Sequence, residues 1–577
     1  MKIKRALLLL LAIAMMFTLF ACKPAEPTAD DTGDDTVASN TDDTGDDTAE
    51  PDDTADAPVG EAKIIYALID DPEEMNPTLN TYSRSSNVLQ QLFRGLYKFD
   101  SNNQLVPALA EGYTVDETST VYTFTLKSGL KWSDGSPLTA NDFEYAWKLL
   151  LNPETASGAV SDFYTILNAK EYNDGIATAD DVGIKALDDL TLEVKLTSAI
   201  PWFVSQTATT SYMPVSKAIV EQYGLDWAKT PEHYVSSGPY MLTAINSKEK
   251  VSMAKNPNYY AADEVKIDAI DIMIIPDQET QAIAFENGEL SLNGDPTPQL
   301  RSQYEGTSQL IEAPRAGERH LDVNTTDTVN PQFQDARVRL ALAMTINRKQ
   351  IVENVLRTTE TPLLGFVPYS QPSLVEPDKD YRDVVGNAFE EDIAAAQQLL
   401  ADAGYPNGEG FPVFRLICQS NQTQKDIAQA LQSMWKENLG IDCEIITYEK
   451  GYWDELENDN FDVGFCGWTD DYLDPHAHLK IWAIGGNEYE CNWNVPLADG
   501  SYVETQLTYT DLINQSVIET DPAKREAILR EAEALVTSIM PSIPVYSYKD
   551  YIVTQANLHG VQKNYIGHIN FEFAYFD

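Results

Sequence analysis

Hydrophobic and polar positions repeat along the chain with two different periods, which together predict mixed α/β structure from residue 63 onward. Three segments are predicted to be strands, residues 63–69, 119–129 and 188–198. The second of them alternates with a period of two, as a half-buried strand should. Thr139 followed by Asp142 has the pattern of a capping box, so a helix is expected to begin there and to run to about Leu151.

A βαβ unit is predicted between residues 413 and 448. Segments 413–418 and 443–448 are expected to be its parallel strands, and the residues between them repeat with a helical period. The apolar face of this helix is expected to comprise Ile427, Ala430, Leu431, Met434 and Trp435. Gly440 is the expected C-terminal cap. In such folds ligands bind at the carboxyl ends of the strands.

The segment GWTDDYLDP, residues 467–475, lies at such a strand end. Residues 461–468 are predicted to form the next strand, and Asp474–Pro475 to begin a helix. Carboxylates and aromatic rings therefore gather at a position where α/β proteins hold ligands. A later helix is expected to begin at Asp521–Pro522. Its predicted apolar positions are Ile528, Ala532, Leu535 and Ile539.

Length and charge restrict the class of protein. A chain of 577 residues is too long for one hydrophobic core, so two to four domains are expected. The net charge of −50 excludes nucleic acid as a partner, because phosphate binding needs basic patches. Five cysteines do not make a disulfide scaffold. Free thiols and disulfides both remain open for the two pairs Cys418 with Cys443, on neighbouring predicted strands, and Cys466 with Cys491, on either side of the acidic segment.

The N-terminus has the pattern of a secretory signal peptide. A basic start precedes the apolar run 6–20, which is too short to span a bilayer. The run ends in LFAC, residues 19–22, which resembles the lipobox of bacterial lipoproteins. Residues 1–21 are therefore expected to be removed, leaving Cys22 as the lipid-bearing first residue.

An acidic segment follows. Residues 23–60 contain thirteen Asp or Glu and no aromatic residue, and the sequence DDTGDDT occurs twice. Neither copy has the glycine and the glutamate that an EF-hand calcium loop requires at its sixth and twelfth positions. The composition predicts that residues 22–60 form a disordered tether, because like charges repel and little apolar surface can be buried.

Several segments of the remaining chain resemble one family, the family 5 extracellular solute-binding proteins, which include the oligopeptide-binding proteins of ABC importers. The resemblance extends from about residue 63 to 577. The segments that carry it are residues 109–157, 237–242, 255–260, 333–348 and 467–475. It implies an α/β, periplasmic-binding-protein-like class II clamshell with an extra inserted domain, whose lobes close by hinge bending.

The resemblance also implies domain boundaries. Domain I is expected to be discontinuous and to comprise residues 61–83, 209–317 and 541–577. Domain II, residues 84–208, is inserted into it, and domain III, residues 318–540, supplies the second ligand lobe.

The family pattern G-W-x-x-D places Asp471 where a peptide's α-amino group binds. A buried ammonium needs an ionised partner, which agrees with this role. The resemblance implies that the ligand's main chain runs along neighbouring residues and that aromatic side chains from a crossing strand face the cleft. The other implied binding residues are Gly467, Trp468, Thr469, Asp470 and Tyr472, with Asp71 and Glu73 on the opposite side and Tyr546 and Tyr548 on the crossing strand.

The chain departs from the family at the positions that bind the carboxyl end of the peptide. Some members bind the peptide carboxylate with basic residues, whereas the aligned positions here are Gln424, Leu456 and Phe465. We therefore expect the amino end to be fixed and peptide length to vary, because bridging water can replace direct contacts in the remaining pockets.

Other cargoes and activities were weighed against peptide. His476 and His478 are two positions apart, so a metal shared on one helix face is awkward. Nickel or haem carriers and oligosaccharide carriers nevertheless occur among relatives. Sugar stacking would use Trp468, Tyr472, Trp482 and Trp493. Neither a nucleophile motif nor a phosphate-binding loop stands out, so no enzymatic activity is expected.

Together these features predict a monomeric, lipid-anchored receptor on the extracellular face of the cell membrane, or in the periplasm if the cell has an outer membrane. It is expected to need no cofactor, to bind oligopeptides, and to deliver them to the permease of an ABC importer.

Overall fold

A computed structural model describes residues 62–577 except 101–103, 327–329, 487–490, 492 and 498–499. The predicted signal peptide, Cys22 and the acidic tether lie outside the described residues. Within the described part of the chain, none of the helices has the length and apolar character needed to cross a bilayer.

The first predicted strand forms the edge of a four-stranded sheet of order β1-β10-β9-β8. β1 pairs with β10 in parallel and the other pairs are antiparallel. The strands are β1 (Lys63–Leu68), β8 (Tyr240–Asn246), β9 (Lys250–Lys255) and β10 (Ala269–Ile274).

The second and third predicted strands lie next to each other in a separate antiparallel sheet of order β4-β5-β7-β6. Its strands are β4 (Ala110–Val115), β5 (Val121–Leu126), β6 (Ile184–Asp188) and β7 (Thr191–Lys195). Helix α3 (Ala140–Leu151) follows β5, and its predicted capping box is confirmed, since the Thr139 N–H donates to Asp142 Oδ2 at 2.9 Å.

The largest sheet has seven strands and contains the predicted βαβ unit. β14 (Phe414–Gln419) pairs in parallel with β15 (Cys443–Tyr448), and α13 (Gln422–Leu439) connects them. Gly440 ends α13 with a φ of 74°, as predicted. The predicted apolar face is correct except that Ala428, and not Ala430, is fully buried.

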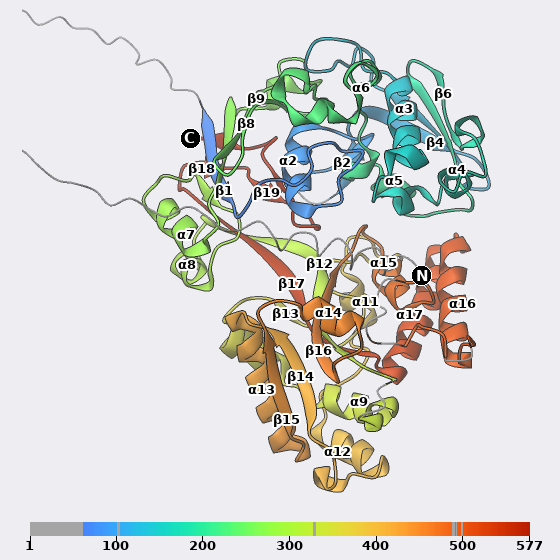
Figure 1. Ribbon diagram of the computed structural model, residues 1–577, viewed down its shortest axis with the longest axis vertical. Coiled ribbons are helices and arrows are strands. Elements are labelled where there is room, and N and C mark those ends of the chain that lie inside the picture. Colours follow the sequence, from blue (N-terminus) through green and yellow to red (C-terminus); the bar gives the residue numbers. More distant parts are fainter. Residues whose placement is uncertain (1–61, 101–103, 327–329, 487–490, 492, 498–499) are drawn as a thin grey trace, which may run out of the picture. The chain divides into compact units, whose positions relative to one another are not determined.

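Two long antiparallel strands, β12 (Leu310–Val323) and β17 (Ser542–Thr554), lie side by side in the middle of this sheet (Figure 1). β16 (Val463–Thr469) pairs with the other edge of β12, and the short strands β11 (Leu292–Asn293) and β13 (Thr361–Pro362) pair with β17. β12 runs across the predicted boundary at residue 317, and its pairing with β17 shifts register between Pro314 and Glu318. The three-domain division stays a prediction.

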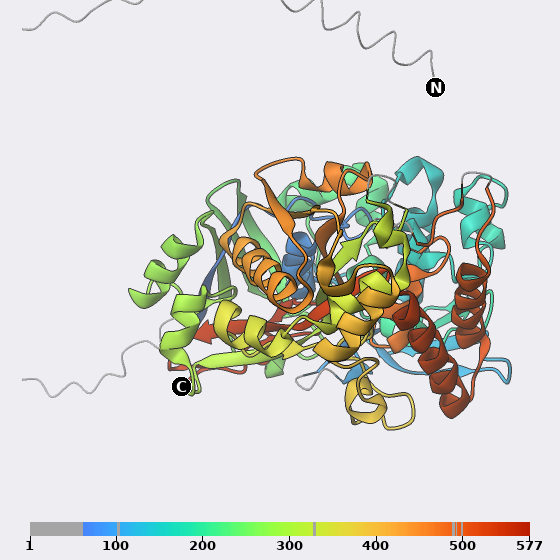
Figure 2. The same ribbon diagram turned by 90° about the horizontal axis from the view of Figure 1, so that it is seen from below.

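The predicted buried face of α17 (Pro522–Ile539) is confirmed at Ala532 and lies one residue away at other positions. Asp521 caps the helix as expected, but the fully buried apolar positions are Leu529, Ala532 and Val536, whereas Ile528 and Leu535 are only partly buried. α16 (Glu504–Ile518) lies beside α17 (Figure 2). The face of α17 that is turned inward also buries Glu533, whose carboxylate pairs with the buried Arg382, and no apolar pattern could indicate that pairing.

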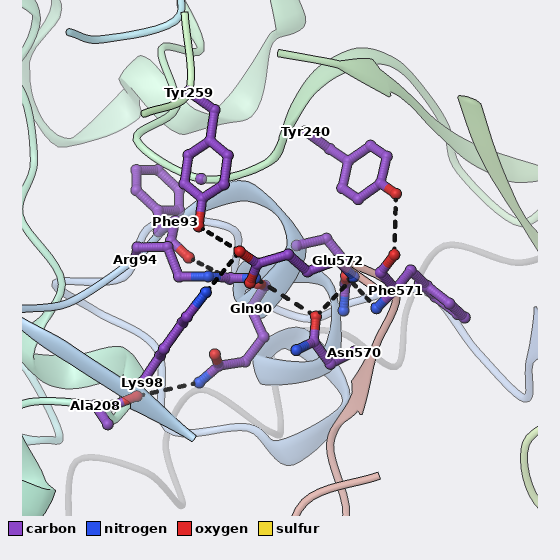
Figure 3. A network of polar contacts seen from close by, with 12 residues as sticks. Gln90, Phe93, Arg94, Lys98, Ala208, Tyr240, Tyr259, Asn570, Phe571 and Glu572 are labelled. Carbon is purple, nitrogen blue, oxygen red and sulfur yellow. Dashed lines mark hydrogen bonds and ion pairs between the residues drawn. The ribbon is translucent and has the colours of Figure 1, made fainter. Parts of the chain in front are cut away.

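The C-terminal segment is fixed by a buried ion-pair network (Figure 3). The Glu572 carboxylate accepts from Arg94 at 2.9 Å, from Lys98 at 2.6 Å and from the Tyr259 hydroxyl at 2.8 Å. Arg94 and Lys98 follow α2 (Ser83–Leu92), so this network joins residues 478 positions apart in the chain. It holds the end of the chain against the N-terminal part of the fold.

Cys418 and Cys443 are free thiols. They do lie on neighbouring parallel strands, but Cys443 pairs with Phe414 and Cys418 with Thr447. A shift of four residues displaces the two Cα atoms by about 13 Å along the strands, far beyond the reach of a disulfide. Cys466 and Cys491 are both buried.

Candidate functional site

A cleft of about 680 Å³ contains most of the acidic segment singled out in the sequence. One wall comes from the end of β16, the helix α15 (Pro475–Leu479) and Arg315 of β12. The facing wall comes from residues 80–86, 158–165 and 202–212. Polar and charged side chains from distant parts of the chain thus meet around one open cleft.

The strand-to-helix junction is built as predicted. Asp474 caps α15 by accepting the His476 N–H at 2.9 Å, and its carboxylate also receives two bonds from Arg525, at 2.6 and 2.9 Å. The position of the loop between β16 and α15 is therefore set by a buried ion pair as well as by the cap.

One edge of β16 is open at its carboxyl end. Antiparallel pairing with β12 continues to Thr469, and the Asp470 N–H then donates to the Ala316 carbonyl at 2.8 Å. On the other edge β14 pairs only with Val463 and Gly464 among the described residues. The last residues of β16 therefore have no neighbouring strand on that edge in the described part of the chain.

Asp471 lies in the cleft with 60% of its side chain exposed. It is not an isolated anion, because Lys480 Nζ lies 3.2 Å from its Oδ2. The same ammonium group lies 4.8 Å from the centre of the Tyr472 ring. A ligand cation that binds Asp471 would compete with this lysine.

A second cleft carboxylate, Asp162, comes from the facing wall and was missed by the sequence analysis. It accepts from the Ser211 hydroxyl at 2.9 Å. Its side chain reaches solvent, but the surrounding protein desolvates it, and this raises the pKa of Asp162 to about 6. The charge of Asp471 also raises this pKa and that of Lys480 lowers it, so the two aspartates share one electrostatic environment.

Tyr472 is held by other side chains and not left open for a ligand. Its ring stacks on Trp202 with the centroids 4.9 Å apart, and its hydroxyl lies 2.8 Å from His476 Nδ1. His476 also stacks on Trp202, at 4.4 Å. Burial, with the charges of Lys480 and Arg525, holds the pKa of His476 well below its usual value, so an uncharged aromatic stack joins the two walls of the cleft.

Asp470 also lines the cleft, but only 1% of the residue is exposed, because its carboxylate bonds to buried side chains. Its carboxylate lies 2.9 Å from His478 Nδ1 and accepts from the Gln371 amide at 2.5 Å. Burial alone would lower the pKa of His478, but Asp470 and Glu318 raise it to about 9. His476 and His478 thus contact different groups, which agrees with the expectation that they do not share one metal.

Five predicted binding residues do not line the cleft. These are Asp71, Glu73, Gly467, Tyr546 and Tyr548. Asp71 accepts the Lys248 N–H at 2.9 Å, and Glu73 pairs with Arg84, so both carboxylates serve local structure. Residues 80–86 of the same segment line the cleft instead.

Tyr546 and Tyr548 lie on β17, which is separated from β16 by β12 in the sheet. The Arg319 guanidinium lies over the Tyr548 ring at 5.5 Å. A Cβ on Gly467 would come within 2.3 Å of the Tyr548 hydroxyl, so Gly467 is needed for the close approach of β16 to this tyrosine. Tyr548 therefore packs against the end of β16 and supports the cleft wall that β16 forms.

The aligned positions for carboxylate binding lie outside the cleft. Leu456 and Phe465 are fully buried in the core, and Gln424 bonds to Gln419. Arg315 and Lys480 are the lysines and arginines that do line the cleft within the described residues. The Arg315 guanidinium donates to Thr469 Oγ1 at 3.0 Å, next to the open edge of β16.

The cleft and the fold match one class of protein. Residues 104–490 match the family model of bacterial extracellular solute-binding proteins, family 5 (middle region). This chain belongs to that family. Its fold is the mixed α/β, periplasmic-binding-protein-like fold expected from the sequence.

Individual relatives cover nearly the whole chain. The oligopeptide-binding protein OppA of Bacillus subtilis is 33% identical over 90% of this chain and 93% of its own length. The structure of an oligopeptide-binding protein from Borrelia burgdorferi superposes with a TM-score of 0.73 at 28% identity, covering 90% of this chain and 100% of the other. A probable deoxycholate-binding periplasmic protein of Escherichia coli is 30% identical, over 85% of this chain and 89% of its own length.

Proposed function

We propose that this protein binds oligopeptides in the cleft and delivers them to the permease of an ABC importer, while a lipid on Cys22 holds it at the outer face of the cell membrane. The observation that carries the proposal is the open edge of β16 beside two carboxylates, Asp162 and Asp471, in one cleft. The oligopeptide-binding relatives support the same cargo.

The open edge of β16 provides recognition of a peptide main chain. An extended peptide can pair with unpartnered backbone groups as an added strand, which gives affinity without reading side chains. Trp468, Thr469 and Asp471 line the cleft at this edge. Broad acceptance of side chains follows, because water can bridge the remaining polar groups.

The two aspartates provide recognition of the amino end. An α-ammonium group placed between Asp162 and Asp471 would displace Lys480 from Asp471 and would be paired from both walls of the cleft. Burying an ammonium group without such partners costs several kcal/mol. Fixing one charged end also fixes which peptide residue meets each pocket.

The carboxyl end is expected to be held weakly. Arg315 is already bonded to Thr469, and its guanidinium lies 3.4 Å from Asp550 Oδ1, so an anion of the protein already pairs with its charge. We therefore expect carboxy-amidated peptides to bind within about tenfold, or about 1.4 kcal/mol, of the free acids. A larger loss on amidation would assign the carboxylate to Arg315.

The test is native mass spectrometry of residues 61–577 with a defined pool of short peptides, followed by calorimetry on the best binder. Free-amine peptides should bind, and the same pool after N-acetylation should not. Asp471→Asn should weaken binding by about 2–5 kcal/mol because the ligand ammonium loses its partner. Asp174→Asn is the matched control, since Asp174 also pairs with a lysine, Lys170, but does not line the cleft.

Equal binding of acetylated peptides would remove the aspartates from the mechanism. Adducts of an oligosaccharide, nickel, haem or a steroid acid in place of peptide would keep the fold and change the cargo. The anchor is tested separately: Cys22→Ala should release the protein from the membrane fraction into the medium without changing peptide affinity. Loss of peptide uptake in cells that lack the protein would support delivery to a permease.

A further inference from the structure

Strand β12 carries three ionisable side chains on one face in the middle of the largest sheet. Glu318, His320 and Asp322 alternate along the strand, and their exposed fractions are 1%, 0% and 0%. Cys466 pairs directly with His320 across the β12–β16 ladder and is 6% exposed. Core strands usually present apolar side chains at such positions, because burying polar groups is costly unless they have specific partners.

The geometry of this group is that of a ligand set. One ligand atom each from His320, Asp322 and Cys466 lies within 4.8 Å of the others. His320 Nδ1 lies 2.6 Å from Glu318 Oε1, which directs Nε2 the other way, to 3.3 Å from Asp322 Oδ1. The three atoms thus converge from two neighbouring strands.

We propose that His320, Asp322 and Cys466 bind a divalent transition-metal ion of the zinc class. An imidazole nitrogen, a carboxylate oxygen and a thiolate are the ligands that zinc takes in proteins. Calcium and magnesium are disfavoured, because both prefer sets made of oxygen atoms alone.

The surrounding residues have the arrangement that supports metal ligands. Histidines that bind metal usually donate their second ring N–H to a carboxylate, and Glu318 is placed to accept that bond. Ser542 Oγ donates to Asp322 Oδ1 at 2.7 Å, and Trp482 Nε1 donates to Ser542 Oγ at 3.1 Å. The second carboxylate oxygen of Asp322 is buried and accepts no hydrogen bond from the described residues.

Buried carboxyls gather around the proposed ligands. Those of Glu318, Asp322 and Asp470 are connected through the imidazoles of His320 and His478. Carboxylates in such positions hold and orient the ligands of a metal ion.

The proposed ion would link β12 to β16 just below the cleft. Cys466 precedes the residues of β16 that line it, whereas His320, Asp322 and Cys466 do not line it themselves. The proposed metal therefore has a structural role, whichever cargo the cleft binds. The proposed site also differs from a metal site at His476 and His478 on α15, since neither of those histidines is a ligand here.

The test is to unfold residues 61–577 in chelator, to refold them with Co²⁺, and to measure bound cobalt and the absorption spectrum. We expect a single cobalt ion per chain and a thiolate-to-cobalt charge-transfer band in the near ultraviolet. Cys466→Ser should lose this band, and Asp322→Asn should lower metal occupancy. Cys418→Ser is the matched control, because Cys418 is a buried free thiol on β14.

Thermal unfolding with and without metal gives a second readout. Bound zinc should raise the unfolding midpoint of the wild type and of Cys418→Ser, because a ligand that binds only the folded state stabilises it, and should not raise that of Cys466→Ser. The proposal would be overturned if the refolded wild type bound no cobalt. It would equally be overturned if Cys466→Ser bound cobalt with an unchanged spectrum.

Discussion

At the scale of single residues, side chains of the same type in one short segment have different roles because their surroundings differ. Asp470, Asp471 and Asp474 lie within five positions, yet one bonds internally to His478, one lies open in the cleft and one pairs with Arg525. The strand end and helix cap could be predicted from the segment itself. Which carboxylate reaches the cleft depends on partners elsewhere in the chain.

His478 should make stability depend on pH. Its pKa is raised from 6.5 to about 9, so its stabilising contribution is complete below pH 6.5 and is lost as pH rises through about 9. We expect the free energy of unfolding to fall by roughly 1–3 kcal/mol across this window. Chemical denaturation at several pH values checks this.

His478→Gln should be less stable below pH 6.5 and should show a flatter profile above it. His559→Gln is the control, because His559 is 39% exposed and pairs with Asp577 at the surface. A profile for His478→Gln parallel to that of the wild type would contradict this prediction.

At the scale of elements, local patterns located some of the helices and strands, among them α3, α13 and α17, and ion pairs then fixed how some elements pack. The unit β14–α13–β15 follows from periodicity and a glycine cap, both of which act over a few residues. The docking of the C-terminal segment was not predicted, since Glu572 bonds to Arg94 and Lys98 near the start of the fold. No short-range pattern marks such a partner.

Glu572→Gln should lower the free energy of unfolding by about 3–5 kcal/mol, because it leaves the buried Arg94 without its anion. Chemical denaturation of both proteins measures the difference. Glu221→Gln is the matched surface control: Glu221 is 60% exposed and pairs with Lys217, so a change within about 0.5 kcal/mol is expected. Similar losses for both variants would show that the buried network has no special role.

At the scale of the whole molecule, β12 and β17 are continuous through the region where the sequence predicts a domain boundary. Their register shift between Pro314 and Glu318 interrupts the ladder next to Arg315, which lines the cleft. An irregular ladder bends more easily than a regular one, so hinge motion is expected at this point.

Peptide binding should therefore reduce the radius of gyration of residues 61–577, because a ligand bridging both cleft walls favours the closed state. Small-angle X-ray scattering with and without a tight-binding peptide checks this, and an N-acetylated peptide that does not bind is the control. An unchanged radius at saturating peptide would indicate that the cleft is already closed without ligand.

Local sequence specifies those features of the protein that depend on neighbours along the chain. Strand and helix periods, the Thr139 and Asp474 caps, and the acidic strand end all arise from contacts within a few residues. Only folding specifies the features that depend on the register between distant strands, or on which residues meet across the cleft. Asp162 faces Asp471, and His320 meets Cys466, only because folding brings residues more than a hundred positions apart to one cleft and one ladder, and no local period encodes such separations.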